Sequence, residues 1–136
     1  MTDVTAAIIV DGNKILIAQR APGQNQAGKW EFPGGKMEPG ETPEECLQRE
    51  IKEELDVDIE VRSFFAESRY EYESGAIRLR AFCCRWISGT FSLIVHSRIE
   101  WVEGDELERY NFAPADIPLA RKLKRLRIGT SGRHWA

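Results

Sequence analysis

Three glutamates near the middle of the chain, Glu50, Glu53 and Glu54, have the spacing to bring their carboxylates together on one helix. At 100° per residue, they fall within an arc of roughly 100°. Like charges this close repel each other, and a divalent cation would reverse that effect. Mg²⁺ and Mn²⁺ take oxygen ligands, commonly a few carboxylates together with substrate phosphates. The cluster therefore indicates a metal site, although acidic residues are also common on solvated helix faces.

A helix that opens at Thr42 must carry these acids. Thr42 suits the N-cap, Pro43 suits the first helical position, and Glu45 completes a capping box. Apolar residues then recur every four positions, at Leu47, Ile51 and Leu55. They form the stripe that a helix packs on a core, and the glutamates border this stripe. A Gly/Pro-rich loop at 33–40 leads into the helix, so loop and acids are expected side by side.

Composition excludes several classes of protein. The 136 residues suit one domain, and 42% hydrophobic and 30% charged residues are ordinary for a globular chain. A net charge of -3 argues against binding a nucleic-acid polymer. Three cysteines, Cys46, Cys83 and Cys84, form no disulfide framework, which favours buried thiols in a reducing compartment. Without a signal peptide or a membrane span, we expect a cytoplasmic protein with no membrane partner.

Most of the remaining chain has the pattern of β-strands. We expect strands at 4–10, 14–18, 30–32, 59–73, 76–86 and 98–102, with a short apolar piece at 91–95. A short acidic helix is expected at 104–110. A second helix should run from Asp116 to Leu126, with Asp116 available as its N-cap. We expect a single domain at residues 1–129 and a C-terminal tail at 130–136.

The stretch from Gly35 to Val57 resembles a known signature. It reads Gly35, five residues, Glu41, seven residues, and then REIKEELDV. This is similar to G-x5-E-x7-R-E-U-x-E-E-x-G-U, with U aliphatic, which marks the Nudix hydrolase superfamily. Asp56 alone departs from it, standing where the family usually has Gly in a left-handed conformation at the helix end. Because Asp can adopt that conformation at some cost, we expect local strain and not loss of the site.

Two further segments resemble the MutT-like branch of that family. Residues 27–35, AGKWEFPGG, are similar to its A-x-x-W-E-F-P-G-G run, and residues 112–118, FAPADIP, to (F/L)-x-P-A-(D/N)-x-P. In that branch an Asp or Asn at the position of Asp116 reads the edge of the base, assisted by an Arg at that of Arg20. Base reading by Asp116 and helix capping by Asp116 are therefore competing interpretations. Glu31, flanked by Trp30 and Phe32, could point into the same pocket.

The resemblance implies an α+β fold, an α/β/α sandwich with a mixed β-sheet between helices. It implies metal ligands at Gly34, Glu50, Glu53, Glu54 and Glu100, with His96 or Glu103 as alternatives to Glu100. It implies catalytic roles for Glu50 or Glu53 as the base, and for Arg49 and Glu41. We expect Arg49 on the side of the helix opposite the acids, paired with a loop carboxylate, and Glu41 in a supporting role. The implied substrate-binding residues are Arg20, Glu31, Phe32, Gly35, Lys36, Phe112 and Asp116.

The function expected from this resemblance is metal-dependent hydrolysis of a nucleoside triphosphate to the monophosphate and pyrophosphate. The cofactor would be Mg²⁺, with Mn²⁺ as an alternative. The substrate would be a modified purine nucleotide such as 8-oxo-dGTP, as in sanitation of the nucleotide pool, or a CTP-type nucleotide. Hydrolysis of ADP-ribose or a dinucleoside polyphosphate is the alternative among enzymes, and a non-catalytic nucleotide-binding module is the alternative outside them. Base specificity, the number of metals, and a monomer or a homodimer are left open.

Overall fold

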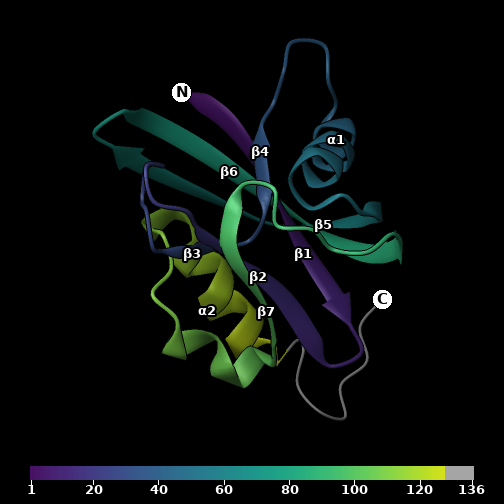
Figure 1. Cartoon of the computed structure of the whole chain (residues 1–136). Helices are drawn as coiled ribbons and strands as arrows, with labels where there is room; N and C mark the ends of the chain where they lie inside the picture. The colour runs from purple at the N-terminus through teal and green to yellow at the C-terminus, as the bar shows by residue number, and fades with distance from the viewer. Residues whose placement is uncertain (128–136) are drawn as a thin grey trace.

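In the computed structural model, which describes residues 1–127, a mixed β-sheet lies between two α-helices (Figure 1). The strands are β1 (Thr2–Asp11), β2 (Lys14–Arg20), β3 (Trp30–Glu31), β4 (Gly34–Lys36), β5 (Asp58–Tyr72), β6 (Gly75–Ser88) and β7 (His96–Val102). The helices are α1 (Pro43–Leu55) and α2 (Ile117–Arg125), and the 3₁₀ turns are η1 (Gly104–Arg109) and η2 (Pro114–Asp116). This arrangement confirms the expected α+β architecture.

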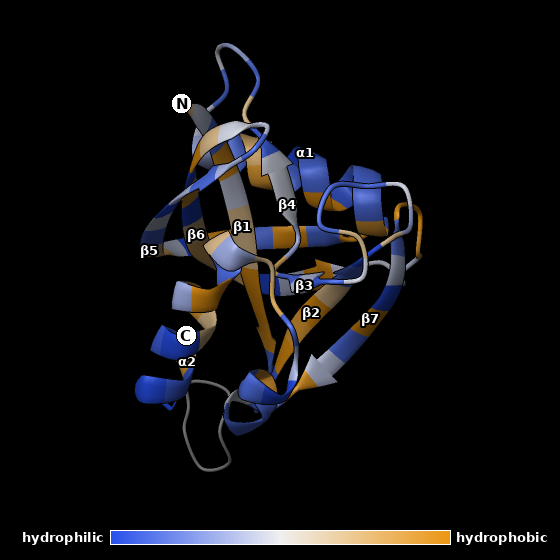
Figure 2. Ribbon diagram, turned by 90° about the vertical axis from the view of Figure 1, so that its left-hand side faces the viewer, coloured by the Kyte–Doolittle hydropathy of each residue, from blue (hydrophilic) through white to orange (hydrophobic). Residues whose placement is uncertain are grey.

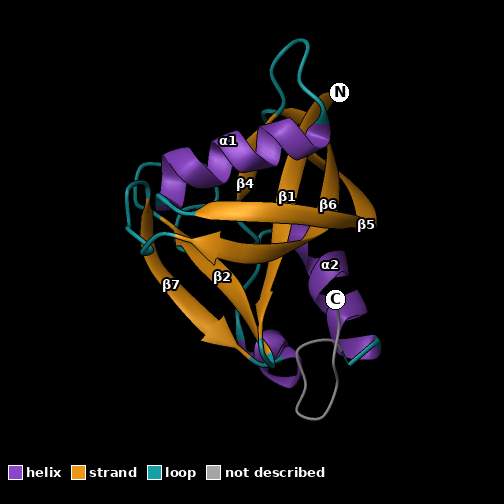
Figure 3. Cartoon of the chain, turned by 90° about the vertical axis from the view of Figure 1, so that its right-hand side faces the viewer, coloured by secondary structure: helices purple, strands orange, loops and turns teal. Residues whose placement is uncertain are grey.

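Strand β1 joins two halves of the sheet. Residues 2–9 pair in parallel with β6, and residues 4–6 pair antiparallel with β4. The end of β1 instead pairs with β2, through Val10 opposite Ile15 and Asp11 opposite Lys14. Strand β2 then pairs with both β3 and β7. The sheet therefore divides into a β4–β1–β6–β5 half and a β3–β2–β7 half, which Figure 3 shows diverging from the β1–β2 hairpin.

Each face of the sheet has its own hydrophobic core. Side chains of a strand point alternately to opposite faces, so Ile8 belongs to one core and Ile9 to the other. The core with Ile8 includes Leu119 and Leu123 of α2. The core with Ile9 takes the apolar stripe of α1. Figure 2 shows hydrophobic residues, in orange, concentrated in β1 and β2, so burial of these strands holds both helices in place.

Both ends of α1 are fixed by local hydrogen bonds. The Thr42 hydroxyl accepts from the Glu45 amide at 3.1 Å, and the Glu45 carboxylate accepts from the Thr42 amide at 2.9 Å, which confirms the capping box. At the other end Asp56 is left-handed, with φ 58° and ψ 34°, as expected for its position. The amides of Ser92 and Ile94 donate to the last carbonyls of the helix, which would otherwise lack partners.

Three expectations from the sequence need correction or restriction. Residues 34–36, assigned to a loop, form β4 against β1, because Gly34 brings its backbone closer to Thr5 than any side chain would allow. The short acidic helix is a 3₁₀ helix. The tail at 130–136 lies outside the described residues. Within residues 1–127, no helix has the length and apolar character needed to cross a membrane.

Candidate active site

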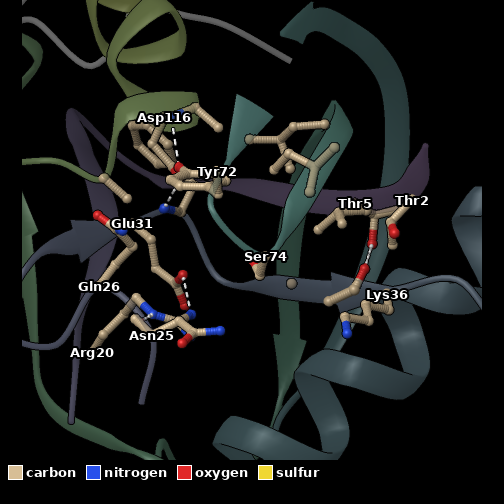
Figure 4. A pocket seen from close by; sticks show the side chains of 18 of the residues that line it. Thr2, Thr5, Arg20, Asn25, Gln26, Glu31, Lys36, Tyr72, Ser74 and Asp116 are labelled. Carbon is tan, nitrogen blue, oxygen red and sulfur yellow. Dashed lines mark hydrogen bonds and ion pairs between the residues drawn. The ribbon is translucent and has the colours of Figure 1, made fainter. Parts of the chain in front are cut away.

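A pocket of ≈ 490 Å³ opens where the two halves of the sheet diverge. We distinguish two regions of it. The acidic region consists of Gly34, Gly35, Glu50 and Glu54, from β4 and α1. The Glu31 cluster consists of Arg20, Glu31, His96 and Asp116, of which all but His96 line the pocket. Figure 4 shows Glu31, Arg20 and Asp116 on one side of the pocket and Lys36 with Thr5 on the other.

Glu54 is the most unusual acid of the acidic region. Its Oε1 atom is buried and has no hydrogen-bond partner among the described residues. Burial raises the pKa of Glu54 to about 8, and the nearby charges of Glu31 and Glu50 add to the rise. A buried carboxylate oxygen without a partner is unfavourable unless a positive charge reaches it. This oxygen therefore has the environment expected of a metal ligand.

Glu50 lies against the backbone of β4. A Cβ atom added to Gly35 would stand 2.3 Å from the Glu50 carboxyl carbon, so only glycine leaves room for this carboxylate. Burial raises the pKa of Glu50, and its contact with Arg49 opposes the rise. Gly35 in β4 thus makes room for the acid, and its neighbour Gly34 lets the strand approach β1.

Arg49 connects the carboxylates of this region. Its Nε and Nη2 atoms bind both oxygens of Glu41 at 2.6 and 2.9 Å, and this contact lowers the pKa of Glu41 to about 2. Its Nη1 atom also donates to Glu50 at 2.7 Å and to Glu53 at 3.0 Å. The expected pairing with a loop carboxylate is present, but the expectation that Arg49 lies opposite the acids is wrong. Glu53 is one helical turn from Arg49, so the two side chains share a side.

The donor set fits a hard divalent cation. The available atoms are carboxylate oxygens, and the Glu54 oxygen has no competing partner in the described part of the chain. No three Asp, Glu, His or Cys side chains of residues 1–127 converge closely enough to hold an ion by themselves. Mg²⁺ commonly completes its ligand shell with water and substrate phosphate. Glu53 has a more exposed side chain, at 53%, and lies outside the pocket lining.

The three candidates for a further metal ligand all have other partners. Glu100 on β7 accepts from Arg98 at 2.6 Å. Glu103 accepts from Asn13 at 3.0 Å, and His96 contacts Glu31 at 2.8 Å. None of the three is among the described residues that line the pocket. A ligand role for Glu100 therefore stays a prediction without support from its position.

The carboxylate of Glu31 is held at both oxygens. Arg20 Nη1 lies 2.8 Å from its Oε1 atom, and His96 Nε2 lies 2.8 Å from its Oε2 atom. The flanking Trp30 and Phe32 are buried in the core, so alternation along the chain turns Glu31 to the opposite face. The expectation that Glu31 points into a pocket agrees with its place in the pocket wall.

Asp116 is buried and does not cap α2 with its side chain. Its Oδ1 atom accepts from the Phe32 amide at 2.9 Å. The capping interpretation is therefore wrong, and one reason is that Pro118, at the second helical position, has no amide to donate. Burial raises the pKa of Asp116 well above its ordinary value, and the charge of Glu31 adds to the rise.

Other pocket residues differ from the expected set. Phe112 stacks on Phe32 with ring centroids 5.2 Å apart, but it is buried away from the pocket wall. Lys36 is exposed at the rim. Tyr72 was not predicted, yet it lines the pocket and its hydroxyl accepts from the Ala115 amide at 2.9 Å. Only strand alternation marks Tyr72 in the sequence, and that signal does not distinguish it from its neighbours.

Comparison with known proteins places the chain among characterised sequences. The model of the NUDIX domain family matches residues 1–129. The chain is 40% identical over 127 residues to the CTP pyrophosphohydrolase of Escherichia coli (strain K12), which covers 93% of this chain and 94% of that protein. It is 37% identical over 117 residues to the 8-oxo-dGTP diphosphatase of the same organism, covering 85% and 90% of the two chains.

A solved structure has the same architecture. The solution structure of the E. coli ORF135 protein aligns with a TM-score of 0.81 at 38% identity, covering 98% of this chain and 95% of that chain. Its likeness extends over both halves of the sheet and both helices, because the aligned part includes nearly all of the described residues. The pocket therefore lies within a known architecture.

Proposed function

The chain belongs to the NUDIX domain family, and on this premise we propose that it hydrolyses a nucleoside triphosphate to the monophosphate and pyrophosphate. The observation that carries the proposal is that one pocket contains both the partly buried acids of α1 and a separate set of hydrogen-bonding side chains. The acids suit a polyphosphate with its metal, and the second set suits a base. Its relatives act on CTP and on 8-oxo-dGTP, which are both nucleoside triphosphates.

Enzymes of this family generally require a divalent metal ion, and we infer that Mg²⁺ serves here, with Mn²⁺ as a substitute. Glu50 and Glu54 would hold it, with Glu53 and the Gly34 carbonyl as further ligands. When bound, such an ion neutralises phosphate oxygens and makes water more acidic. Arg49 keeps Glu50 and Glu53 in place, and one of these two carboxylates accepts the proton of the attacking water.

The Glu31 cluster would bind the base. Because the raised pKa of Asp116 favours its protonated form, its free oxygen can donate a hydrogen bond, whereas the Glu31 carboxylate accepts one. A neighbouring donor and acceptor match a base edge that offers both an acceptor and an N–H group. Cytosine offers a ring nitrogen beside its amino group, and an 8-oxopurine offers an oxygen beside N7–H. The cluster is therefore compatible with the substrates named for both relatives.

Hydrolysis of a nucleotide panel tests the proposal. The panel contains CTP, UTP, dGTP, 8-oxo-dGTP, ADP-ribose and a dinucleoside polyphosphate, each with Mg²⁺ or Mn²⁺. We expect release of pyrophosphate and a monophosphate from one or more of the triphosphates, and ¹⁸O-labelled water should show which phosphorus is attacked. If only ADP-ribose or the dinucleoside polyphosphate is hydrolysed, those compounds replace the triphosphates as the assigned substrates. If no nucleotide is hydrolysed with either metal, the proposed activity is contradicted.

The Glu53→Gln substitution distinguishes an enzyme from a nucleotide-binding module. In an enzyme, loss of this carboxylate should lower kcat by about 10²-fold or more, because it removes a metal ligand or a base. A module that only binds should keep its nucleotide affinity and show no turnover before or after the change. Glu44→Gln is the matched control, because Glu44 is an exposed glutamate in the first turn of the same helix.

A further inference from the structure

His96 occupies a buried position that packing alone does not explain. Its side chain is 2% exposed, and its Nε2 atom contacts Oε2 of Glu31 at 2.8 Å. A carboxylate can only accept, so Nε2 is the donor of this bond. The second ring nitrogen, Nδ1, is buried and has no hydrogen-bond partner in the described chain. An apolar side chain would avoid this unpaired atom, so the distinctive contribution of the histidine is its bond to Glu31.

A break in strand pairing places His96 on the side of Glu31. The β2–β7 ladder runs regularly until Gln19 opposite Arg98, and then shifts so that Arg20 stands opposite His96. Ile99 and Trp101 pack toward the core that contains α1. Continued alternation would put Ser97 on that face and turn His96 away from it. A bulge re-aims side chains in this way, and here it brings His96 to the same face as Arg20.

The carboxylate of Glu31 is consequently fixed from two strands. Arg20 on β2 binds one oxygen and His96 on β7 binds the other, although Glu31 itself belongs to β3. A carboxylate held at both oxygens cannot rotate, yet each oxygen keeps a lone pair for another donor. Glu31 lines the pocket, with a side chain that is 14% exposed, so a bound molecule can supply that donor.

We propose that His96 is a positioning residue for base selection, which holds Glu31 so that its carboxylate accepts an N–H group of the nucleobase. This inference rests on the proposed function, because it concerns the base of the same substrate. The Glu31 carboxylate held in this way favours bases that carry a hydrogen-bond donor at a position where a close analogue carries an acceptor. The amino group of cytosine has that relation to the O4 atom of uracil, and N7–H of 8-oxoguanine has it to N7 of guanine.

Binding of the monophosphate products tests the inference without turnover. Dissociation constants are measured by calorimetry for the pairs CMP with UMP and 8-oxo-dGMP with dGMP. The wild-type chain should prefer the first member of at least one pair. His96→Leu should reduce that preference by about tenfold, which is the scale of one hydrogen bond to a charged group. His96→Gln retains an N–H donor and should restore most of the preference.

Two controls separate positioning from packing. Ser97→Ala changes the exposed neighbour of His96 and should leave the preference unchanged. In the Glu31→Gln background, adding His96→Leu should have no further effect on the preference, because the carboxylate to be positioned is gone. Thermal unfolding of each variant confirms that it is folded.

A measurement on the wild-type chain needs no substitution. The NMR resonance of the His96 imidazole Nε2–H should shift more when the preferred monophosphate is added than when its analogue is added.

The outcomes for the two proposals are distinct. Suppose that the wild-type chain turns over no triphosphate, and that His96→Leu loses the preference between the monophosphates. This result would contradict the proposed activity and support the positioning role. Equal weakening of both members of a pair in His96→Leu would overturn the positioning role, because loss of packing alone predicts that result. Absence of any preference in the wild-type chain, or an imidazole resonance that responds equally to both members of each pair, would overturn it as well.

Discussion

The acidic region and the Glu31 cluster share one pocket, but the chain assembles them differently. Every residue of the acidic region lies between positions 34 and 54, on β4 and the helix that follows it. The Glu31 cluster draws its residues from β2, β3, β7 and η2. Its hydrogen bonds join residues that are as far as 84 positions apart in the chain. One region depends on local sequence, and the other depends on how the two halves of the sheet meet.

This difference suggests a division of labour. Local construction keeps the acids at a constant spacing whatever happens at the edges of the sheet, which suits chemistry common to all nucleotides. The Glu31 cluster can change with a single substitution or a shifted strand register, which suits selection among bases. If the division holds, substitutions in the acidic region should change the rate for all substrates, and substitutions in the cluster should change the preference among them.

The largest effect is expected from Glu54→Gln in the acidic region. Loss of this carboxylate should lower kcat/KM by about 10²- to 10⁴-fold for every substrate, because the proposed metal site would lose a ligand. The ratio of kcat/KM between CTP and UTP should change less than about twofold. Steady-state kinetics on both nucleotides measures this, with Glu44→Gln as the exposed control. A change in the ratio as large as the change in rate would show that the two regions do not act separately.

The two glycines of β4 should give opposite results when each is changed to alanine. In Gly35→Ala the new Cβ meets the flexible end of Glu50, so Glu50 moves and kcat/KM falls by about tenfold or more, with little change in the free energy of unfolding. In Gly34→Ala the Cβ would stand 2.0 Å from the Thr5 carbonyl oxygen. Strand β4 must then move, which costs about 1 to 3 kcal/mol or more. Urea unfolding and kinetics of both variants distinguish these outcomes, and equal destabilisation would contradict them.

The smallest effect concerns stability and pH at Asp116. In the folded chain, Asp116 stays protonated at pH values above its ordinary pKa of 3.8. In that pH range the folded chain therefore binds more protons than the unfolded chain does. This contribution to stability is fully present below about pH 4 and is lost as pH rises toward the folded pKa, by about 1.4 kcal/mol per unit of pKa rise. Asp116→Asn has no such proton and can still accept from the Phe32 amide. The free energy of unfolding of the wild type, minus that of Asp116→Asn, should therefore fall as the pH rises above about pH 4, and a constant difference would contradict the raised pKa.

The sequence predicted the acidic region in more detail than the Glu31 cluster. The capping box at Thr42, the apolar stripe and the left-handed Asp56 follow from local spacing, and the structure shows all three. Arg49 and Glu53 are four positions apart, so helical spacing places them on one side of α1, contrary to the expectation from the sequence. The position of β4 was missed because its glycines resemble a loop until the contact with Thr5 is known.

The contacts of the Glu31 cluster could not be predicted from local patterns. His96 meets Glu31 only because pairing shifts between β2 and β7, and no residue type marks that shift. The carboxylate of Asp116 was expected either to read a base or to cap a helix. It does not cap the helix, and one of its oxygens accepts from the Phe32 amide, through a contact between η2 and the residue after β3 that requires the folded sheet. Such contacts depend on the register between strands that are distant in the sequence, and the spacing of residues along one helix does not reveal that register.

The bonds of Arg49 to several carboxylates have a consequence for the life of the protein before it meets its substrate. The acidic helix carries its own counter-ion for Glu50 and Glu53, so part of the repulsion among its glutamates is offset without a metal ion. We therefore expect the chain to fold to the same structure when no divalent cation is supplied.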